Sequence, residues 1–263
     1  MRWFETGGRA LRYGIRHGRG PYLVLIHEMG GSIESWEQVL AHLPPELGVV
    51  LPEMRGMGGS EKIAATPGFG EIAADVLALL DHLGLTAPVI LSGCAVGGGV
   101  AVRFALDYPD RTAGLAPLGP AMDVAEAARA GVLALADRMA AEGMAAMEPA
   151  LLDRTYPEAY RARNPGHFAT LRGRWRGNDP VSFAHFFRML AATDLLPLLP
   201  GLRCPVHFAA GSADVFRPPA YVEAAARRVA GARMTLLDAG HHAADHAPAA
   251  VAALLAGLAA ELA

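Results

Sequence analysis

The chain has few cysteines, little charge and no long basic tract. It contains two cysteines in 263 residues, Cys94 and Cys204, which is too few for the disulfide framework of a small secreted protein and suits a reducing compartment. Its formal net charge is −3, and its one short basic cluster is the stretch 172–176. This charge balance argues against nucleic acid as a partner.

Export and membrane signals are also lacking. The first nine residues contain no apolar core of the kind that a signal peptide needs. The apolar segment 248–262 is too short to span a bilayer, and Glu261 stands at its end. Because neither kind of signal is found, we expect a cytoplasmic protein without membrane contact. There is also no internal repeat and no low-complexity linker.

What the chain does contain is enough apolar sequence for one large core, with 52% hydrophobic and 19% charged residues. Apolar runs alternate with helical patterns along most of its length, which predicts an α/β fold with a mostly parallel central sheet flanked by helices. The expected strands are 3–6, 10–16, 22–26, 49–52, 89–92, 114–118, 205–210 and 234–237, and the expected helices are 35–43, 69–83, 96–108, 219–229 and 248–262.

The alternation breaks between residues 121 and 203. This stretch is rich in Ala, Met and Arg, follows a helical periodicity and carries late aromatic residues: Phe168, Trp175, Phe183, Phe186 and Phe187. We therefore divide the chain into a core of residues 1–120 and 204–263 and a helical insertion of residues 121–203.

The most informative motif is the sharp glycine turn after the strand at 89–92. Gly93-Cys94-Ala95-Val96-Gly97 matches the Gly-x-Ser-x-Gly nucleophile elbow at four of its five positions, and the serine is the one that is missing. Such a strained turn is normally kept to expose one reactive side chain, but alanine has no nucleophilic atom. Taken alone, the motif would also fit an ordinary strand-to-helix turn of an α/β protein.

Four more loops follow predicted strands in the same way. The segments 27–31 and 53–60 are glycine-rich, whereas Gly211-Ser212-Ala213-Asp214 and Gly240-His241 each place a titratable residue just beyond a strand. In this order, the five motifs resemble those of the α/β-hydrolase-fold family, in particular its esterase-like and lactonase-like serine hydrolases. Glu28 stands for a glycine of the family pattern, and Glu53 stands for an aspartate.

The resemblance implies an α/β-hydrolase fold with a helical cap over the active site, and it implies a role for each matching residue. Ala95 occupies the nucleophile position where serine is expected, His241 is the general base, and Asp214 orients the imidazole and stabilises its charged form. The backbone amides of Met29 and Val96 form the oxyanion hole.

Other residues compete for some of these roles. His242 and His246 lie close to His241, although only His241 follows the glycine in register. Asp123, just beyond the strand at 114–118, is the alternative acid. Cys94 is one position away from the apex of the turn, and we interpret it as a small buried hydrophobic residue and not as a substitute nucleophile.

Three explanations of Ala95 remain open at this point. The first is a serine-to-alanine change that keeps the pocket and removes the nucleophile. The second is a pseudo-enzyme that binds a ligand through the same cleft. The third is chemistry that needs only a histidine and an aspartate, as in a cofactor-free lyase or oxygenase. Retention of the other motifs favours the first.

The resulting prediction is a hydrolase that cleaves a small carboxylic ester or lactone through an acyl-enzyme, and that is inactive with Ala95 in place. Amide or carbon–carbon bond hydrolysis, a ligand-binding pseudo-hydrolase and the histidine–aspartate enzyme are the alternatives. The expected substrate-binding residues are His27, Trp175, Phe186 and Phe187, and arginines in the insertion suit a substrate that carries a carboxylate. We expect no cofactor, no metal and, as a further partner, a second copy of the chain in a homodimer.

Overall fold

The alternating strands and helices form one eight-stranded sheet in the computed structural model, which describes residues 2–263. Met1, the first residue of the predicted core, lies outside the described residues. The strand order is β1-β2-β4-β3-β5-β6-β7-β8, antiparallel along β1-β2-β4 and parallel from β4 to β8. The strands are β1 Arg2–Thr6, β2 Arg9–Arg16, β3 Arg19–Ile26, β4 Leu47–Pro52, β5 Val89–Cys94, β6 Thr112–Leu118, β7 His207–Gly211 and β8 Arg233–Leu237.

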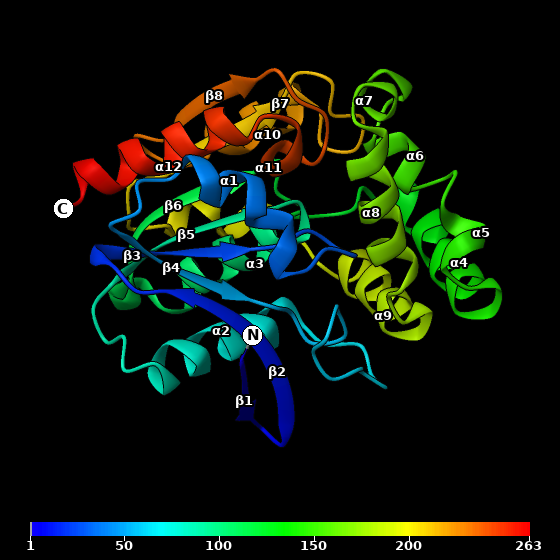
Figure 1. Ribbon diagram of the computed structural model, residues 1–263, viewed down its shortest axis with the longest axis horizontal. Helices are drawn as coiled ribbons and strands as arrows, with labels where there is room; N and C mark the ends of the chain where they lie inside the picture. Colours follow the sequence, from blue (N-terminus) through cyan, green and yellow to red (C-terminus); the bar gives the residue numbers. More distant parts are fainter. Residues whose placement is uncertain (1) are drawn as a thin grey trace.

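Helices cover both faces of this sheet because its central strands are apolar on both sides (Figure 1). One face packs against α2 (Phe69–His82), α3 (Val96–Asp107) and α10 (Pro219–Ala226). The other packs against α1 (Glu37–His42), α11 (Ala243–His246) and α12 (Pro248–Glu261). Short 3-10 turns occupy Ile33–Trp36 (η1), Pro109–Arg111 (η2) and Leu196–Gly201 (η3). The predicted α/β fold with a mostly parallel sheet is confirmed.

The predicted helix 35–43 is wrong at its start. The chain first makes the 3-10 turn η1, and the α-helical part α1 is only six residues long. The cause is local, because the hydroxyl of Ser35 accepts a hydrogen bond from the amide of Ser32 at 3.2 Å and the amide of Ser35 donates to the Ser32 carbonyl at 3.0 Å. This serine pair tightens the first turn.

Six helices follow β6, in the stretch where the sequence predicts an insertion; we call α4–α9 the cap helices. Their bounds are α4 Glu126–Glu142, α5 Met144–Met147, α6 Leu152–Thr155, α7 Glu158–Arg163, α8 Pro165–Arg176 and α9 Pro180–Ala191. A bridge between Asp123 and Asp194 joins the two ends of this segment. The cap helices lie beyond the ends of the strands, at one side of the molecule (Figure 1). A Cβ added to Gly30, just beyond β3, would lie 2.6 Å from the Phe183 ring.

None of the helices within residues 2–263 combines the length and the hydrophobicity that crossing a membrane requires.

Candidate active site

The turn between β5 and α3 has a strained backbone. Ala95 has φ = 52° and ψ = −114°, and it is the only non-glycine residue with positive φ among residues 2–263. Such a conformation costs about 1–3 kcal/mol and persists only where the surrounding structure enforces it. Here the Ala95 amide donates to the carbonyl of Leu118 at 3.0 Å, and the Ala95 carbonyl accepts from the amide of Ala121 at 2.8 Å. These contacts hold the turn in place.

Two glycines let the backbone segments around this turn approach closely. A Cβ on Gly93 would lie 2.3 Å from the carbonyl carbon of Gly97, and a Cβ on Gly97 would lie 2.3 Å from the carbonyl oxygen of Ile26. No side chain fits at either position without displacing backbone. The turn therefore has the tight strand-to-helix packing that the sequence motif predicts.

His241 and Asp214 form a hydrogen-bonded pair beyond the ends of β8 and β7. His241 Nδ1 lies 2.8 Å from Asp214 Oδ2, and Asp214 Oδ1 accepts hydrogen bonds from the amides of Phe216 and Arg217, both at 2.8 Å. Burial raises the pKa of Asp214, but these three donors outweigh burial and bring the pKa below its usual value. Because Nδ1 faces the carboxylate, Nε2 is the ring nitrogen left for other partners.

Asp123, the alternative acid, is engaged elsewhere. Its Oδ1 accepts a hydrogen bond from the Tyr221 hydroxyl at 2.7 Å, and its backbone carbonyl accepts one from the side chain of Arg217 at 2.9 Å. The hydrogen-bond partner of His241 is thus Asp214, as the strand order in the sequence suggests.

Cys94 is buried, as expected of a small hydrophobic residue. Its thiol donates to the backbone carbonyl of His241 at 3.3 Å, and burial raises the pKa of the thiol far above its usual value. A thiol in this environment stays protonated and is a poor nucleophile.

A cavity of about 630 Å³ lies over the β5–α3 turn, between the core and the cap helices. Ala95, His241, Met29 and Val96 all line it. Val96 is the first residue of α3, so its amide has no acceptor within the helix and is available to a ligand. The cap contributes mostly apolar side chains, among them Val132, Leu135, Leu151, Trp175, Phe183, Phe187 and Leu190.

Two of the four residues expected to bind substrate do not line this cavity. His27 is fully buried, with Nδ1 2.7 Å from the Glu28 carbonyl and Nε2 accepting from the Met54 amide at 3.0 Å, so both ring nitrogens are used within the protein. Phe186 is buried in the packing of α9. Trp175 and Phe187 do line the cavity.

The side chain of Glu53 stabilises the loop formed by the motif at 53–60. Glu53 Oε2 accepts hydrogen bonds from the amides of Gly59 at 2.6 Å and Ser60 at 3.0 Å, and Oε1 lies 3.1 Å from Arg12. The carboxylate therefore closes its own loop, and the glutamate found here in place of aspartate performs this role.

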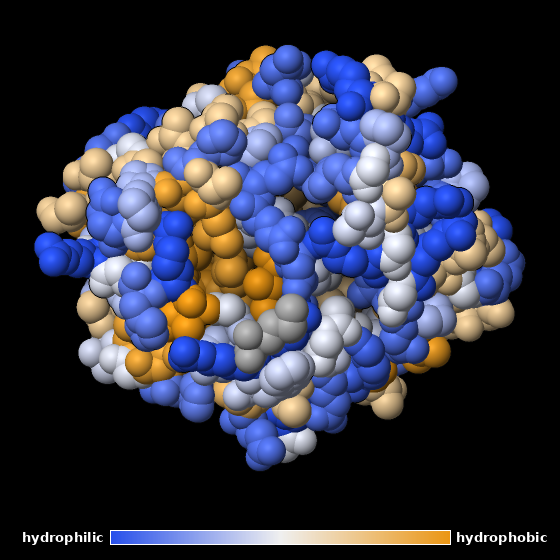
Figure 2. Space-filling view, viewed as in Figure 1, coloured by the Kyte–Doolittle hydropathy of each residue, from blue (hydrophilic) through white to orange (hydrophobic). Residues whose placement is uncertain are grey.

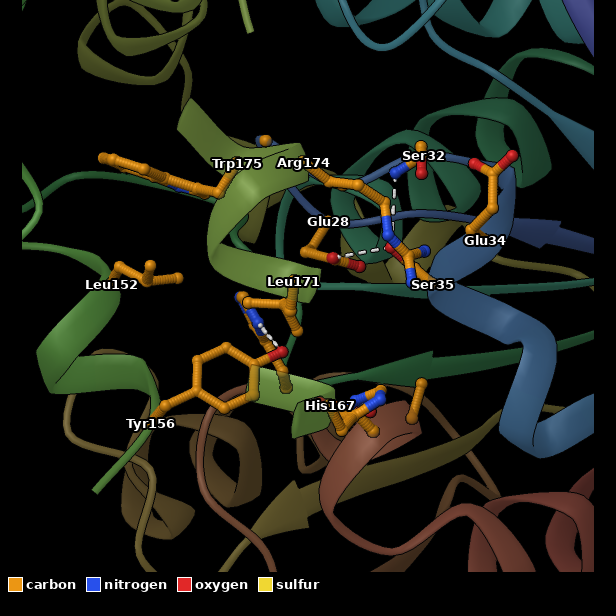
Figure 3. Close-up of a pocket in the computed structure, with 15 residues that line it drawn as sticks. Glu28, Ser32, Glu34, Ser35, Leu152, Tyr156, His167, Leu171, Arg174 and Trp175 are labelled. Carbon is orange, nitrogen blue, oxygen red and sulfur yellow. Dashed lines mark hydrogen bonds and ion pairs between the residues drawn. The ribbon is translucent and has the colours of Figure 1, made fainter. Parts of the chain in front are cut away.

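A smaller polar pocket, which the sequence motifs did not predict, lies beside the main cavity; Leu152, Trp175 and His242 line both. Its other polar side chains come from the loop after β3 and the turn η1, from the cap and from α11: Glu28, Ser32, Glu34, Ser35, Tyr156, His167, Arg174 and Asp245. Arg174 extends from α8 toward the loop that carries Ser32 and Ser35 (Figure 3). Figure 2 shows a hollow where α8 lies opposite η1, with mostly hydrophilic residues around it.

Glu28, the residue that replaces a glycine of the family pattern, points into this polar pocket (Figure 3). It accepts a hydrogen bond from the Ser35 hydroxyl at 2.8 Å, and burial raises the pKa of its carboxyl. Across the pocket, His242 Nδ1 lies 3.0 Å from the Tyr156 hydroxyl. The replacement at position 28 was the only sequence signal for this pocket.

Asp245 joins the cap helices to the core at the rim of the polar pocket. Its Oδ1 is 2.7 Å from His167 Nε2 and 3.0 Å from Gln38 Nε2, and its Oδ2 accepts from the Tyr160 hydroxyl at 3.0 Å. Tyr160 and His167 belong to the cap helices, whereas Gln38 belongs to α1. This one carboxylate therefore contributes to the docking of α7 and α8 on the core.

His246 makes the folded state sensitive to acid. Burial lowers the pKa of its imidazole to about 4 even though Asp245 is adjacent, and Nδ1 accepts a hydrogen bond from the Gly240 amide at 2.9 Å. An unfolded histidine has a pKa near 6.5, so the stability that depends on the neutral ring is complete above about pH 6.5 and is lost as the pH falls toward about 4.

We therefore expect a His246→Asn variant to lose less stability on acidification than the parent. Between about pH 7 and about pH 4.5, the fall in the free energy of unfolding should be smaller by about 2 kcal/mol. Urea unfolding at the two pH values measures this difference. Equal falls in parent and variant would show that His246 is not buried in its neutral form.

Comparison with known proteins identifies the family. A sequence model of the α/β hydrolase fold matches residues 21–248. The chain therefore belongs to the α/β-hydrolase fold family.

Several relatives match most of the chain. The magnesium-chelatase 30 kDa subunit of Rhodobacter capsulatus is 30% identical over 244 residues, which span 84% of this chain and 81% of that protein. The structure of the enol-lactonase from Burkholderia xenovorans LB400 superposes with a TM-score of 0.91 at 27% identity, covering 98% of this chain and 99% of that one. A thermophilic esterase from Thermogutta terrifontis superposes with a TM-score of 0.90 at 28% identity, covering 99% and 97%.

Within residues 2–263, no group of three or more histidine, cysteine, aspartate or glutamate side chains is arranged to hold a metal ion.

Proposed function

We propose that this chain has the active-site architecture of an ester or lactone hydrolase, with Ala95 at the position of the nucleophilic serine. The observation that carries the proposal is the strained turn at Ala95, which lines one cavity together with the His241–Asp214 pair. Backbone strain of this kind is typical of functional sites. The similarity to an enol-lactonase and an esterase over nearly the whole chain supports the same reaction class.

With serine at position 95, the chemistry follows from these residues. The serine oxygen attacks the carbonyl carbon of the ester, and His241 Nε2 takes the proton of the hydroxyl. The amides of Met29 and Val96 bind the negative charge on the carbonyl oxygen. The carbon–oxygen bond of the ester then breaks and the alcohol leaves with the proton from His241. A water molecule, activated by the same histidine, releases the acid and restores the serine.

With alanine at position 95, the covalent step is blocked and binding is retained. The cavity keeps its shape, because serine differs from alanine by one oxygen atom. The His241–Asp214 pair is still able to move a proton, so proton-transfer chemistry without a nucleophile is the second candidate function, and its support is the intact 2.8 Å hydrogen bond of the pair.

The test compares the parent with an Ala95→Ser variant on a panel of esters, lactones, amides and 1,3-diketones. We expect ester or lactone hydrolysis by the serine form alone. Equal activity of both forms would contradict the assignment of position 95 and favour histidine–aspartate chemistry. Saturable binding with no turnover by either form would identify a ligand-binding protein. Preferential turnover of the amides or diketones would reassign the scissile bond.

A further inference from the structure

Two arginines stand among the mostly apolar side chains that line the main cavity. Arg154 comes from α6 in the cap, and Arg217 comes from the core loop that follows Asp214. Apart from these two arginines, no Asp, Glu, Lys or Arg is among the residues that line the cavity. The cavity thus has two positive charges and no negative charge of its own.

Neither arginine is neutralised by a carboxylate within the described chain. The guanidinium of Arg154 lies over the Phe216 ring, 4.6 Å from its centroid, and that of Arg217 lies 5.1 Å from the centroid of Tyr221. Arg217 also donates to the backbone carbonyl of Asp123 at 2.9 Å, whereas the carboxylate of Asp123 is bound by the Tyr221 hydroxyl at 2.7 Å. Within residues 2–263, no ion pair involves Arg154 or Arg217.

Other arginines of the cap helices behave differently. Arg172 and Arg176 both pair with Glu148, the latter at 2.5 Å, and Arg161 pairs with Asp153 at 2.9 Å. These three arginines, none of which lines the main cavity, are therefore paired with carboxylates. Aromatic stacking holds the guanidiniums of Arg154 and Arg217 in place. Apart from the hydrogen bond from Arg217 to the Asp123 carbonyl, their N–H groups are available to an anion.

We propose that Arg154 and Arg217 bind a carboxylate of the substrate, so that the cavity selects an ester or lactone that carries a second, ionised acid group. This inference rests on the proposed function for the scissile bond, but it concerns binding alone. The backbone amide of Arg217 also donates a hydrogen bond to Asp214. The anionic end of the ligand therefore lies on the Asp214 side of the cavity. The ligand class is therefore a half-ester of a short dicarboxylic acid, or a lactone with a carboxylate side chain.

The experiment uses the Ala95 protein, in which turnover does not interfere with binding. Calorimetry at low salt compares monomethyl glutarate and monomethyl adipate with their neutral dimethyl esters. We expect the half-esters to bind at least on the order of tenfold more tightly, because charge-assisted hydrogen bonds to a carboxylate are worth about that factor. Raising the salt concentration should reduce this preference.

Variants locate the preference within the cavity. Arg154→Gln and Arg217→Gln should each weaken binding of the half-ester, and the double variant should bind half-ester and diester equally. Arg217→Lys keeps a positive charge and should retain part of the preference. The matched control is Arg188→Gln, which removes a cap arginine that pairs with Asp137 at 2.7 Å and does not line the cavity.

Three results would overturn the proposal: equal affinities for half-ester and diester in the parent, a preference that survives in the double variant, and no binding of any of the four compounds at millimolar concentration. These are binding results on the parent and its arginine variants. The proposed function is tested separately, by the turnover of the Ala95→Ser variant, so the two failures can be told apart. A serine form that hydrolyses neutral esters while the parent shows no charge preference would contradict only the role of the arginines.

Discussion

An Ala95→Ser variant should gain hydrolytic turnover of on the order of 10⁴- to 10⁶-fold over the parent on its preferred ester or lactone, which is the scale of the loss when a serine nucleophile is removed from a triad. The gain is expected to be this large because the rest of the machinery is in place. Asp214 already orients His241 through a 2.8 Å hydrogen bond, and Val96 presents an amide from the start of α3. Steady-state kinetics with matched esters measures the gain.

A double-mutant cycle separates this mechanism from a general improvement in binding. His241→Ala should cost nearly the whole gain in the serine form and almost nothing in the alanine form, because the two side chains act as a unit. His207→Gln is the matched control, since this histidine bonds Thr235 at 2.8 Å and does not line the cavity. A loss on His241→Ala that is equal in both backgrounds would mean that position 95 and His241 work independently.

A Gly97→Ala variant should lose the native fold or at least about 3 kcal/mol of unfolding free energy, the scale of severe overpacking. The added Cβ would lie 2.3 Å from the carbonyl oxygen of Ile26, and neither residue can move away easily, because α3 holds the backbone of Gly97 and the sheet holds that of Ile26. Urea unfolding monitored by circular dichroism measures the change.

Gly257 provides the control for this substitution. It is an exposed helical glycine of α12, and a Cβ there would meet nothing within 4 Å, so Gly257→Ala should stabilise the protein by about 0.5–1 kcal/mol. If Gly97→Ala lowered the unfolding free energy no more than Gly257→Ala does, the close packing of β5 against α3 at Gly97 would be contradicted.

The fold and the Asp214–His241 hydrogen bond were predictable because they depend on local patterns. Strand ends followed by glycine or by a titratable residue fix which side chains stand at the carboxyl edge of a parallel sheet. The order of Gly211–Asp214 and Gly240-His241 along the chain was therefore enough to choose Asp214 over Asp123 as the partner of His241.

The parts that failed or were missed depend on packing between distant segments. His27 looked like a ligand-binding residue, but its two ring nitrogens are used by Glu28 and Met54, and the second contact comes from another loop. Phe186 and Phe187 are neighbours in sequence, yet only Phe187 reaches the cavity, because successive helix positions face different directions. Arg217 belongs to no motif, and only the folded cap shows that it shares a cavity with Arg154.

The most direct test of the account is the intact mass of the Ala95→Ser protein after brief incubation with an activated ester and acid quenching. We expect a single added acyl group on the serine form, located by peptide mapping to residue 95, and no adduct on the parent or on the serine form that also carries His241→Ala. Turnover by the serine form without any trapped adduct, or an adduct on the parent chain, would contradict the claim that position 95 is the nucleophile position.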